Sequence, residues 1–184
     1  MSLLKKITLF IFAGWMFPLS LFAQRALTVD DLARWNRITE QAISANGKWV
    51  TATMAPWVGD GTVYLYDAKG TEVATYFPAE KPVFSSSSGY LLVTQTPRKE
   101  TLNSLKVAKV KKNKMPMNRL IIRSLPGGEE LIDSVKTYQL AERADWLAYQ
   151  SGRKDSTLVI RSLDGKTVYR CPAVSGFKFA AKSG

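Results

Sequence analysis

Ala42-Ile43-Ser44-Ala45-Asn46-Gly47-Lys48-Trp49-Val50 sets the pattern of this 184-residue chain: an apolar approach, a small polar turn and a run that opens on an aromatic residue. The pattern returns at 83–93, around Ser85-Ser86-Ser87-Ser88-Gly89, and in a more degenerate form at 140–149. Such turn residues tolerate positive φ or bind the backbone through their side chains, and the flanking apolar residues can line a buried sheet face. Each copy therefore predicts a β-hairpin.

A second pattern follows each hairpin, a strand of β-branched or aromatic residues that runs into a glycine-containing turn. It occurs at 63–70, 120–128 and 158–165, and a further short apolar stretch follows at 73–77, 131–135 and 168–171. This gives about four short strands per unit, and the spacing of the units is near the roughly 40 to 50 residues of a propeller blade. We therefore predict an all-β fold, the first three blades and the start of a fourth of a β-propeller.

The repeats also set the expected boundaries within a partial propeller at 41–184. The predicted blades are 41–80, 81–136 and 137–175, with the start of the next at 176–184. The middle blade is longer because it carries a lysine-rich insertion at 98–119, which we call the insertion. A β-sandwich is the alternative, since frequent turn signals fit it too, but three recurrences of both halves in one order favour the propeller. The fourth copy stops on its own turn glycine, which suggests a truncated protein.

The N-terminus has the pattern of a signal peptide at 1–23. Lys5 and Lys6 precede the almost wholly apolar stretch 7–22, and Ala23 stands before a predicted cut. A transmembrane anchor is the alternative, but the stretch is at the short limit for spanning a bilayer. We expect an exported protein, periplasmic or secreted, without a stable membrane anchor after cleavage. Residues 24–40 are predicted to form a linker and a short helix, with Thr28 as its cap.

Cysteine and histidine usage limits the chemistry. Cys171 is the single cysteine, so an internal disulfide is excluded, and we expect it to be a small buried hydrophobe. The chain has no histidine, and its acidic residues show no calcium-loop spacing. Gly59-Asp60-Gly61 is predicted to be a hairpin turn and no phosphate loop. We assign no metal, no cofactor and no cofactor-binding residue.

The positive charge is concentrated in one place. The formal net charge is +11, and the insertion holds eight basic residues against Glu100 alone, a local charge of +7. Such a block can bind nucleic acid or an anionic surface. The insertion lacks the aromatic residues that single-strand binders use for stacking. We therefore expect a solvated hairpin extension and no nucleic-acid partner, and the oligomeric state is left open.

Two stretches together resemble a known family. Residues 27–32 followed by Trp35, and then 43–50, are similar to the opening of secreted serine peptidases of the prolyl oligopeptidase family, in the branch that resembles dipeptidyl and acylaminoacyl peptidases. Met115-Pro116-Met117-Asn118 at the end of the insertion also resembles bacterial members. The resemblance implies a propeller followed by a C-terminal α/β-hydrolase domain, and a peptide substrate that the propeller gates or positions. A non-catalytic exported propeller similar to TolB, which binds a protein or glycan partner, is the alternative.

The catalytic machinery implied by the resemblance has no counterpart in this sequence. The family's Gly-x-Ser-x-Gly nucleophile motif is absent, and without histidine there is no general base, so no catalytic residue is assigned. Whether the chain belongs to an enzyme depends on a domain that these residues do not contain. Glu129-Glu130 matches the amine-binding pair of dipeptidyl peptidases by composition only, and we expect it to be a solvated hairpin tip.

Overall fold

A computed structural model of the chain describes residues 28, 31, 35–125, 127–152 and 156–180. The chain divides into two compact units, 1–32 and 33–184, and each is described separately. The predicted signal peptide at 1–23 lies outside the described residues. Among the helices that are described, none combines the length and the apolar character needed to cross a bilayer.

The first unit contributes the predicted cap at Thr28. The Thr28 amide donates to Asp31 Oδ2 at 2.9 Å, and the Asp31 amide donates to Thr28 Oγ1 at 3.3 Å. This reciprocal arrangement satisfies two amides that a helix start leaves without partners. The hydrogen bond from the Thr28 backbone lowers the pKa of Asp31. The other residues of the predicted short helix fall outside the described part, apart from Trp35.

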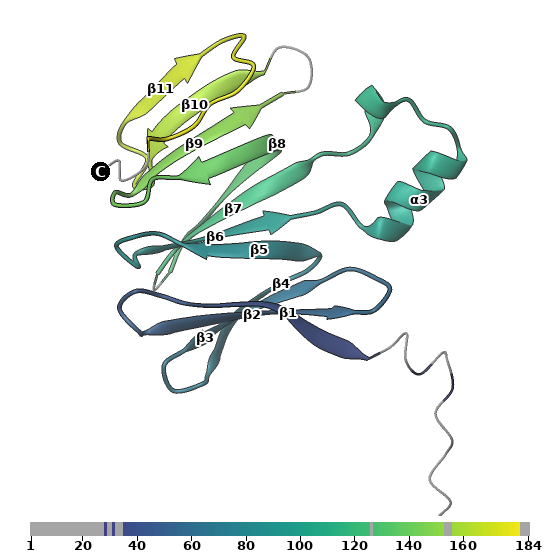
Figure 1. The fold of residues 1–184 in the computed structure, drawn as a ribbon, viewed down its shortest axis with the longest axis horizontal. Coiled ribbons are helices and arrows are strands. Elements are labelled where there is room, and N and C mark those ends of the chain that lie inside the picture. Colours follow the sequence, from purple (N-terminus) through teal and green to yellow (C-terminus); the bar gives the residue numbers. More distant parts are fainter. Residues whose placement is uncertain (1–27, 29–30, 32–34, 126, 153–155, 181–184) are drawn as a thin grey trace, which may run out of the picture. The chain divides into compact units, whose positions relative to one another are not determined.

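The second unit is built from antiparallel strands (Figure 1). They are β1 (Asn36–Ile43), β2 (Trp49–Pro56), β3 (Thr62–Asp67), β4 (Glu72–Tyr76), β5 (Ala79–Phe84), β6 (Tyr90–Gln95), β7 (Asn118–Ser124), β8 (Glu129–Leu140), β9 (Trp146–Ser151), β10 (Thr157–Ser162) and β11 (Val168–Cys171). Their order follows the sequence, β1 to β4 in one sheet and β5 to β11 in another. β1 starts at Asn36, ahead of the boundary at 41 that the first hairpin suggested, and pairs with β2 from Asn36 to Ile43.

β8 is shared by two successive blades. Its first part pairs with β7 as far as Val135, and its second part pairs with β9 from Val135 onward. Ser134 has a positive φ of 57°, and both ladders shift register beside it, so the strand bends there. The described strands therefore form three four-stranded units: blade 1 (β1–β4), blade 2 (β5–β7 and the start of β8) and blade 3 (the end of β8 and β9–β11). The all-β, propeller-like fold predicted from the repeats is confirmed.

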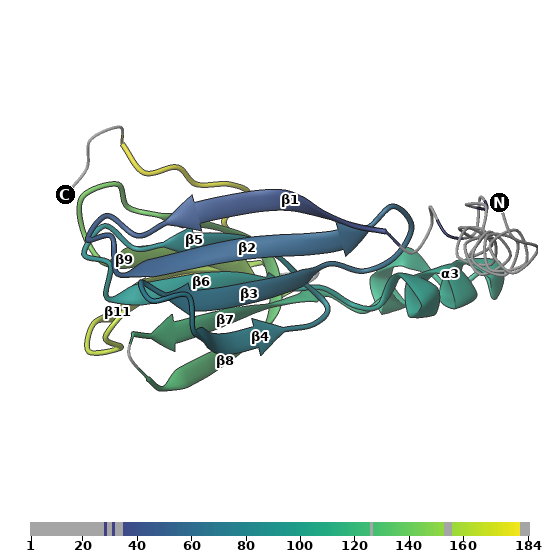
Figure 2. The same ribbon diagram turned by 90° about the horizontal axis from the view of Figure 1, so that it is seen from below.

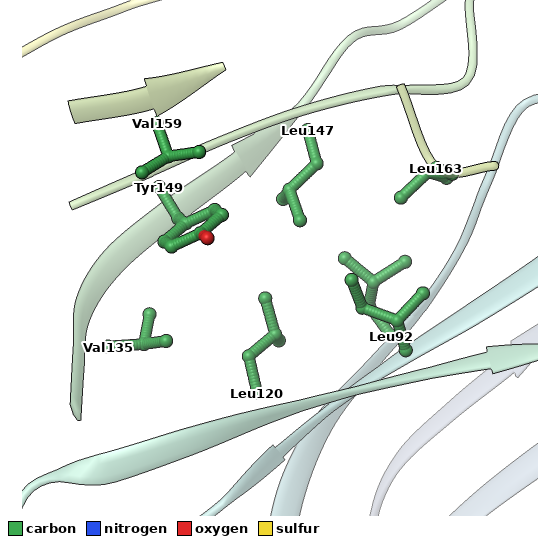
Figure 3. Close-up of a cluster of buried hydrophobic side chains, with 8 residues drawn as sticks. Leu92, Leu120, Val135, Leu147, Tyr149, Val159 and Leu163 are labelled. Atoms are coloured by element: carbon green, nitrogen blue, oxygen red, sulfur yellow. The ribbon is translucent and has the colours of Figure 1, made fainter. Parts of the chain in front are cut away.

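Two apolar clusters join the blades face to face. The cluster between blades 1 and 2 includes Val63, Leu65 and Tyr76 from blade 1. The cluster between blades 2 and 3 includes Leu147 and Tyr149 from blade 3 and Leu92 and Leu120 from blade 2 (Figure 3). Blade 2 lies between the two clusters and contributes alternate residues of one strand to each. Most of the apolar surface therefore becomes buried only when neighbouring blades stack.

The repeated turns contact one another across the blades. Gly47 and Ser88 both have positive φ, at 69° and 60°. A serine is less suited than glycine to this conformation, but the Ser88 hydroxyl accepts a hydrogen bond from the Asn46 amide at 3.1 Å. In the next pair, the Ser87 amide donates to Asp145 Oδ1 at 3.4 Å. The predicted turns are confirmed, and they also link each blade to the following one.

The insertion is helical, which corrects the predicted hairpin extension. It lies between β6 and β7 and contains α3 (Lys99–Val107) and a 3-10 helix (Lys112–Lys114). Lys, Leu, Glu and Ala have high helix propensity, and partly buried Leu102 and Leu105 are spaced three apart, as on one face of a helix. The stretch has too few β-branched residues in alternation to pair as strands.

Candidate functional site

The inner strands of the three blades lie next to one another. β1, β5 and the second half of β8 are the first strands of their blades, and they surround an open cavity of about 540 Å³, which we call the inner-strand cavity. Its lining includes Glu40, Gln41, Lys81, Pro82, Val83, Thr94, Asn118, Arg119, Leu120, Val135, Lys136, Thr137, Tyr138, Gln139 and Leu140. Both charge signs and three amide side chains, those of Gln41, Asn118 and Gln139, therefore line a space shared by three blades.

Hydrogen bonds fix the positions of several of these groups. Lys81 adopts a positive φ of 53°, which turns its amide toward blade 1, where it donates to Glu40 Oε2 at 2.9 Å. The Tyr138 hydroxyl donates to the Lys81 carbonyl at 3.4 Å and accepts from Thr94 Oγ1 at 3.3 Å. One backbone position in β5 is thus held by side chains from both neighbouring blades.

Tyr138 is held in its neutral form. Burial raises the pKa of its hydroxyl, the nearby carboxylates of Glu40 and Glu80 raise it further, and the hydrogen bond from Thr94 lowers it in part. A phenol with a raised pKa stays protonated at neutral pH and acts as a donor. Tyr138 therefore keeps the hydrogen bond that it donates to the Lys81 carbonyl over the physiological pH range.

The cavity has the chemistry of a binding site. Catalysis by a serine would need a base within hydrogen-bond reach, and the sequence contains no histidine. Within the described ranges, no group of three His, Cys, Asp or Glu side chains could hold a metal ion. A cavity of mixed apolar and polar lining, with convergent amide, hydroxyl and charged groups, suits a ligand that has both apolar and polar parts.

Glu129 and Glu130 are exposed and directly follow the hairpin turn, as predicted, but both carboxylates are engaged in ion pairs that the sequence did not indicate. They are the first residues of β8, and their carboxylates bind in different directions. Glu129 Oε1 accepts from Tyr76 at 2.7 Å and from Arg123 at 2.5 Å, while Glu130 pairs with Arg161 at 2.5 Å. The turn itself ends at Gly128, whose φ is 92°, so both residues begin the following strand.

Cys171 is exposed, which corrects the prediction that it is buried. It lies at the end of β11, a four-residue edge strand whose residues are all exposed. The apolar pattern of 168–171 predicted the strand correctly. The prediction of burial was wrong because an outermost strand has a neighbouring strand on one side only.

The residues of the inner-strand cavity were missed by sequence reasoning. The three inner strands can be aligned on a shared hydrogen bond, in which the amide of Ser44, Ser85 or Ala141 donates to a carbonyl five residues later. Glu40 and Lys81 each lie four residues before this position, and Tyr138 lies three before it. Alignment of the repeats would have placed Glu40 and Lys81 at equivalent positions and Tyr138 one residue further along, which a search for catalytic motifs cannot do.

The comparisons place the fold among known structures. No family model and no curated protein matches the chain. It is similar to a structure from an analysis of two prolyl endopeptidases, with a TM-score of 0.50, 13% identity, 73% of this chain covered and 22% of that chain. For prolyl oligopeptidase B from Galerina marginata the TM-score is 0.45 and the identity 13%, with 79% of this chain and 23% of that chain covered. For a eukaryotic initiation factor the TM-score is 0.48 and the identity 12%, with 77% of this chain and 34% of that chain covered.

These identities show a shared fold alone. The chain spans between about a fifth and a third of the structures it matches. The likeness to the prolyl endopeptidase supports a propeller-like part of the kind found in prolyl oligopeptidases. The dipeptidyl-peptidase branch and the truncation stay predictions.

Proposed function

We propose that this chain is the propeller part of an exported serine peptidase related to prolyl oligopeptidases, and that it positions peptide substrates for an α/β-hydrolase domain. The observation that carries the proposal is the likeness to a prolyl endopeptidase over 73% of this chain. The nucleophile and the base would belong to a domain outside these 184 residues, since the chain has no histidine and no Gly-x-Ser-x-Gly motif.

The inner-strand cavity is the proposed peptide contact. An extended peptide presents amide donors and carbonyl acceptors along its length. The side-chain amides of Gln41 and Gln139 can donate to it, and the Tyr138 hydroxyl oxygen, whose hydrogen binds the Lys81 carbonyl, can accept from it. Glu40 and Lys81 add one charge of each sign at the same cavity. These contacts would orient a peptide without hydrolysing it.

Labelling with a fluorophosphonate probe tests the first part of the proposal. We expect the 184-residue chain alone to remain unlabelled, and the polypeptide recovered from its native cells with an antibody to this chain to carry a labelled serine. Peptide mapping should place that serine in a Gly-x-Ser-x-Gly segment. A native polypeptide without a labelled serine would instead favour the non-catalytic exported propeller that binds a protein or glycan.

A Tyr138→Phe variant of the labelled polypeptide tests the cavity. Loss of one hydroxyl should raise KM for a peptide substrate about five-fold, as expected for a hydrogen bond worth about 1 kcal/mol, and leave turnover of a small ester unchanged. Tyr64→Phe is the matched control, because Tyr64 lies on the opposite face of blade 1 from blade 2. Equal KM values for the two variants would argue against peptide contact at the cavity.

A further inference from the structure

Three of the eight basic residues of the insertion hold it to the rest of the protein. Lys99 Nζ donates to the Gly59 carbonyl, and the Lys99 amide donates to Asp60 Oδ1 at 3.0 Å. The Arg98 guanidinium lies over the Phe77 ring, 5.6 Å from its centre. Arg119 Nε pairs with Asp133 Oδ1 at 2.8 Å. These contacts fix the start and the end of the insertion against blades 1 and 2.

The other five basic residues form an unpaired group, which we call the lysine cluster. It consists of Lys106, Lys109, Lys111, Lys112 and Lys114. All five are exposed, and none forms an ion pair with another described residue. The backbone holds them together, because the Lys109 amide donates to the Lys106 carbonyl at 2.9 Å and the Lys114 amide donates to the Lys111 carbonyl at 2.8 Å. Five cations thus lie within nine residues of the chain, and no carboxylate of the described residues pairs with any of them.

Apolar side chains are exposed beside the lysine cluster. Val107 is 84% exposed. A largely apolar groove of about 510 Å³ is lined by Met115, Pro116 and Met117, with Lys112 and Lys136 also lining it. An exposed apolar surface next to cations is unfavourable in water alone and is typical of a surface that binds an anionic amphiphile.

The connection between β2 and β3 extends this surface. Figure 2 shows it at the same end of the strands as α3, and Asp60 of this connection binds the start of α3. Trp57 and Val58 are 70% and 75% exposed there. Tryptophan is favoured at the level of lipid headgroups.

We propose that the α3 end of the molecule binds reversibly to the surface of an anionic lipid bilayer. The lysine cluster would supply attraction to the headgroups, while Val107, Trp57 and Val58 would enter the interface. The insertion has no aromatic side chain on which bases could stack, so a membrane fits it better than a nucleic acid. This inference is independent of the proposed peptidase function.

Vesicle flotation with the full chain tests the proposal. The measured quantity is the gain in binding when vesicles of phosphatidylcholine alone are replaced by vesicles of equal parts phosphatidylcholine and phosphatidylglycerol. We call this gain the anionic increment. The apolar stretch 7–22 is common to every variant, so the difference between variants isolates the lysine cluster. We expect Lys111→Gln with Lys112→Gln to weaken the anionic increment roughly thirty-fold. Each lysine near an anionic surface contributes about 1 kcal/mol, and about 1.4 kcal/mol corresponds to a ten-fold change in binding. Added salt should weaken the increment further.

Lys48→Gln with Lys69→Gln is the matched control. It removes the same charge from two exposed lysines in turns outside the insertion, and should leave the anionic increment nearly unchanged. The proposal is overturned if both double variants bind anionic vesicles equally. It is also overturned if the wild-type chain shows no preference for anionic vesicles, or if it binds a single-stranded RNA in the same buffer and no vesicle.

Discussion

At the residue scale, Glu129 and Glu130 show how two adjacent side chains can link three blades. Successive side chains of a strand point to opposite faces of the sheet. Glu129 therefore reaches Tyr76 of blade 1, while Glu130 reaches Arg161 of blade 3. The same alternation places neighbouring residues of blade 2 in different apolar clusters. One dipeptide can thus couple the central blade to both neighbours.

Loss of the Glu130 carboxylate should destabilise the protein. The side chain of Arg161 is 10% exposed and that of Glu130 is 49% exposed, so Glu130→Ala leaves a largely buried guanidinium without its partner. We expect a loss of about 1 to 2 kcal/mol in the free energy of unfolding, which is below the cost for a fully buried pair because one partner meets solvent. Chemical denaturation followed by tryptophan fluorescence measures it.

Glu80→Ala is the matched control for this loss. Its carboxylate is 46% exposed and lies 3.7 Å from Lys81, whose side chain is 64% exposed. The removed acid is similar in exposure, but the cation left behind is solvated. Equal destabilisation by the two substitutions would contradict the importance of the buried Arg161 partner.

Tyr76 should make stability depend on alkaline pH. Burial, with the hydrogen bond to Glu129, raises the pKa of Tyr76 from 10.0 to about 12. Between these values the folded protein keeps the phenol proton that the unfolded chain has lost, so the free energy of unfolding falls as pH rises from about 10 to 12. We expect a shallower fall for Tyr76→Phe, measured by denaturant unfolding across this range. Parallel curves for the two proteins would exclude this contribution.

At the element scale, the strands could be predicted from the sequence because turn chemistry and strand propensity agreed. β6 illustrates the limit of pattern reading, since Leu91, Leu92 and Val93 are all fully buried and do not alternate. Such a run is expected where a strand is covered on both faces. The insertion was mispredicted as a hairpin because its position between two strands outweighed its helix-forming composition. The exposure of Cys171 depends on which strand is outermost, which local sequence does not specify.

The start of α3 depends on a residue of another blade. Arg98 makes no side-chain cap, and the Lys99 amide donates to the Asp60 carboxylate, at 3.0 Å and 3.3 Å to its two oxygens. An acceptor that satisfies an amide at a helix start stabilises the helix by about 1 kcal/mol, and a negative charge there also favours the helix dipole.

Asp60→Ala should therefore loosen α3 without unfolding the blades. We expect roughly five-fold faster amide hydrogen exchange over 102–107, in line with a loss of about 1 kcal/mol, and unchanged exchange in β6 and β7. Asp60→Asn keeps an oxygen acceptor and should lie between the wild type and the alanine variant. Unchanged exchange over 102–107 in the alanine variant would show that the helix is held by its other contacts.

At the scale of the whole molecule, the repeats indicated how the blades stack but not what lies between them. The inner-strand cavity needs the relative placement of β1, β5 and β8, and its key contact, from the Lys81 amide to Glu40, spans 41 residues. Its polar residues match no catalytic or metal motif, so a search for motifs could not find them. Contacts between blades were predictable in kind, since each blade needs a neighbour, but not residue by residue.

Blade 1 has one face covered by blade 2 and one face without a neighbouring blade among the described strands. Val63 and Leu65 are fully buried on the covered side. The intervening Tyr64 and Tyr66 point to the other side, where their rings stack with centres 6.2 Å apart. Beside them are the partly buried side chains of Val50, Ala52 and Met54. This face is an apolar sheet surface of the type that neighbouring blades cover.

We expect the chain to self-associate through this face of blade 1, because water contact with a broad apolar surface is unfavourable. Tyr64→Lys with Tyr66→Lys should shift the sedimentation profile toward the monomer, since two cations would have to be desolvated at the contact. Val168→Lys with Tyr169→Lys is the matched control, because these exposed residues lie on β11 at the other end of the strand order. Association through residues outside the described part is common to all variants. If both double variants shift the sedimentation profile toward the monomer equally, the added charge is responsible and the face of blade 1 is not the contact.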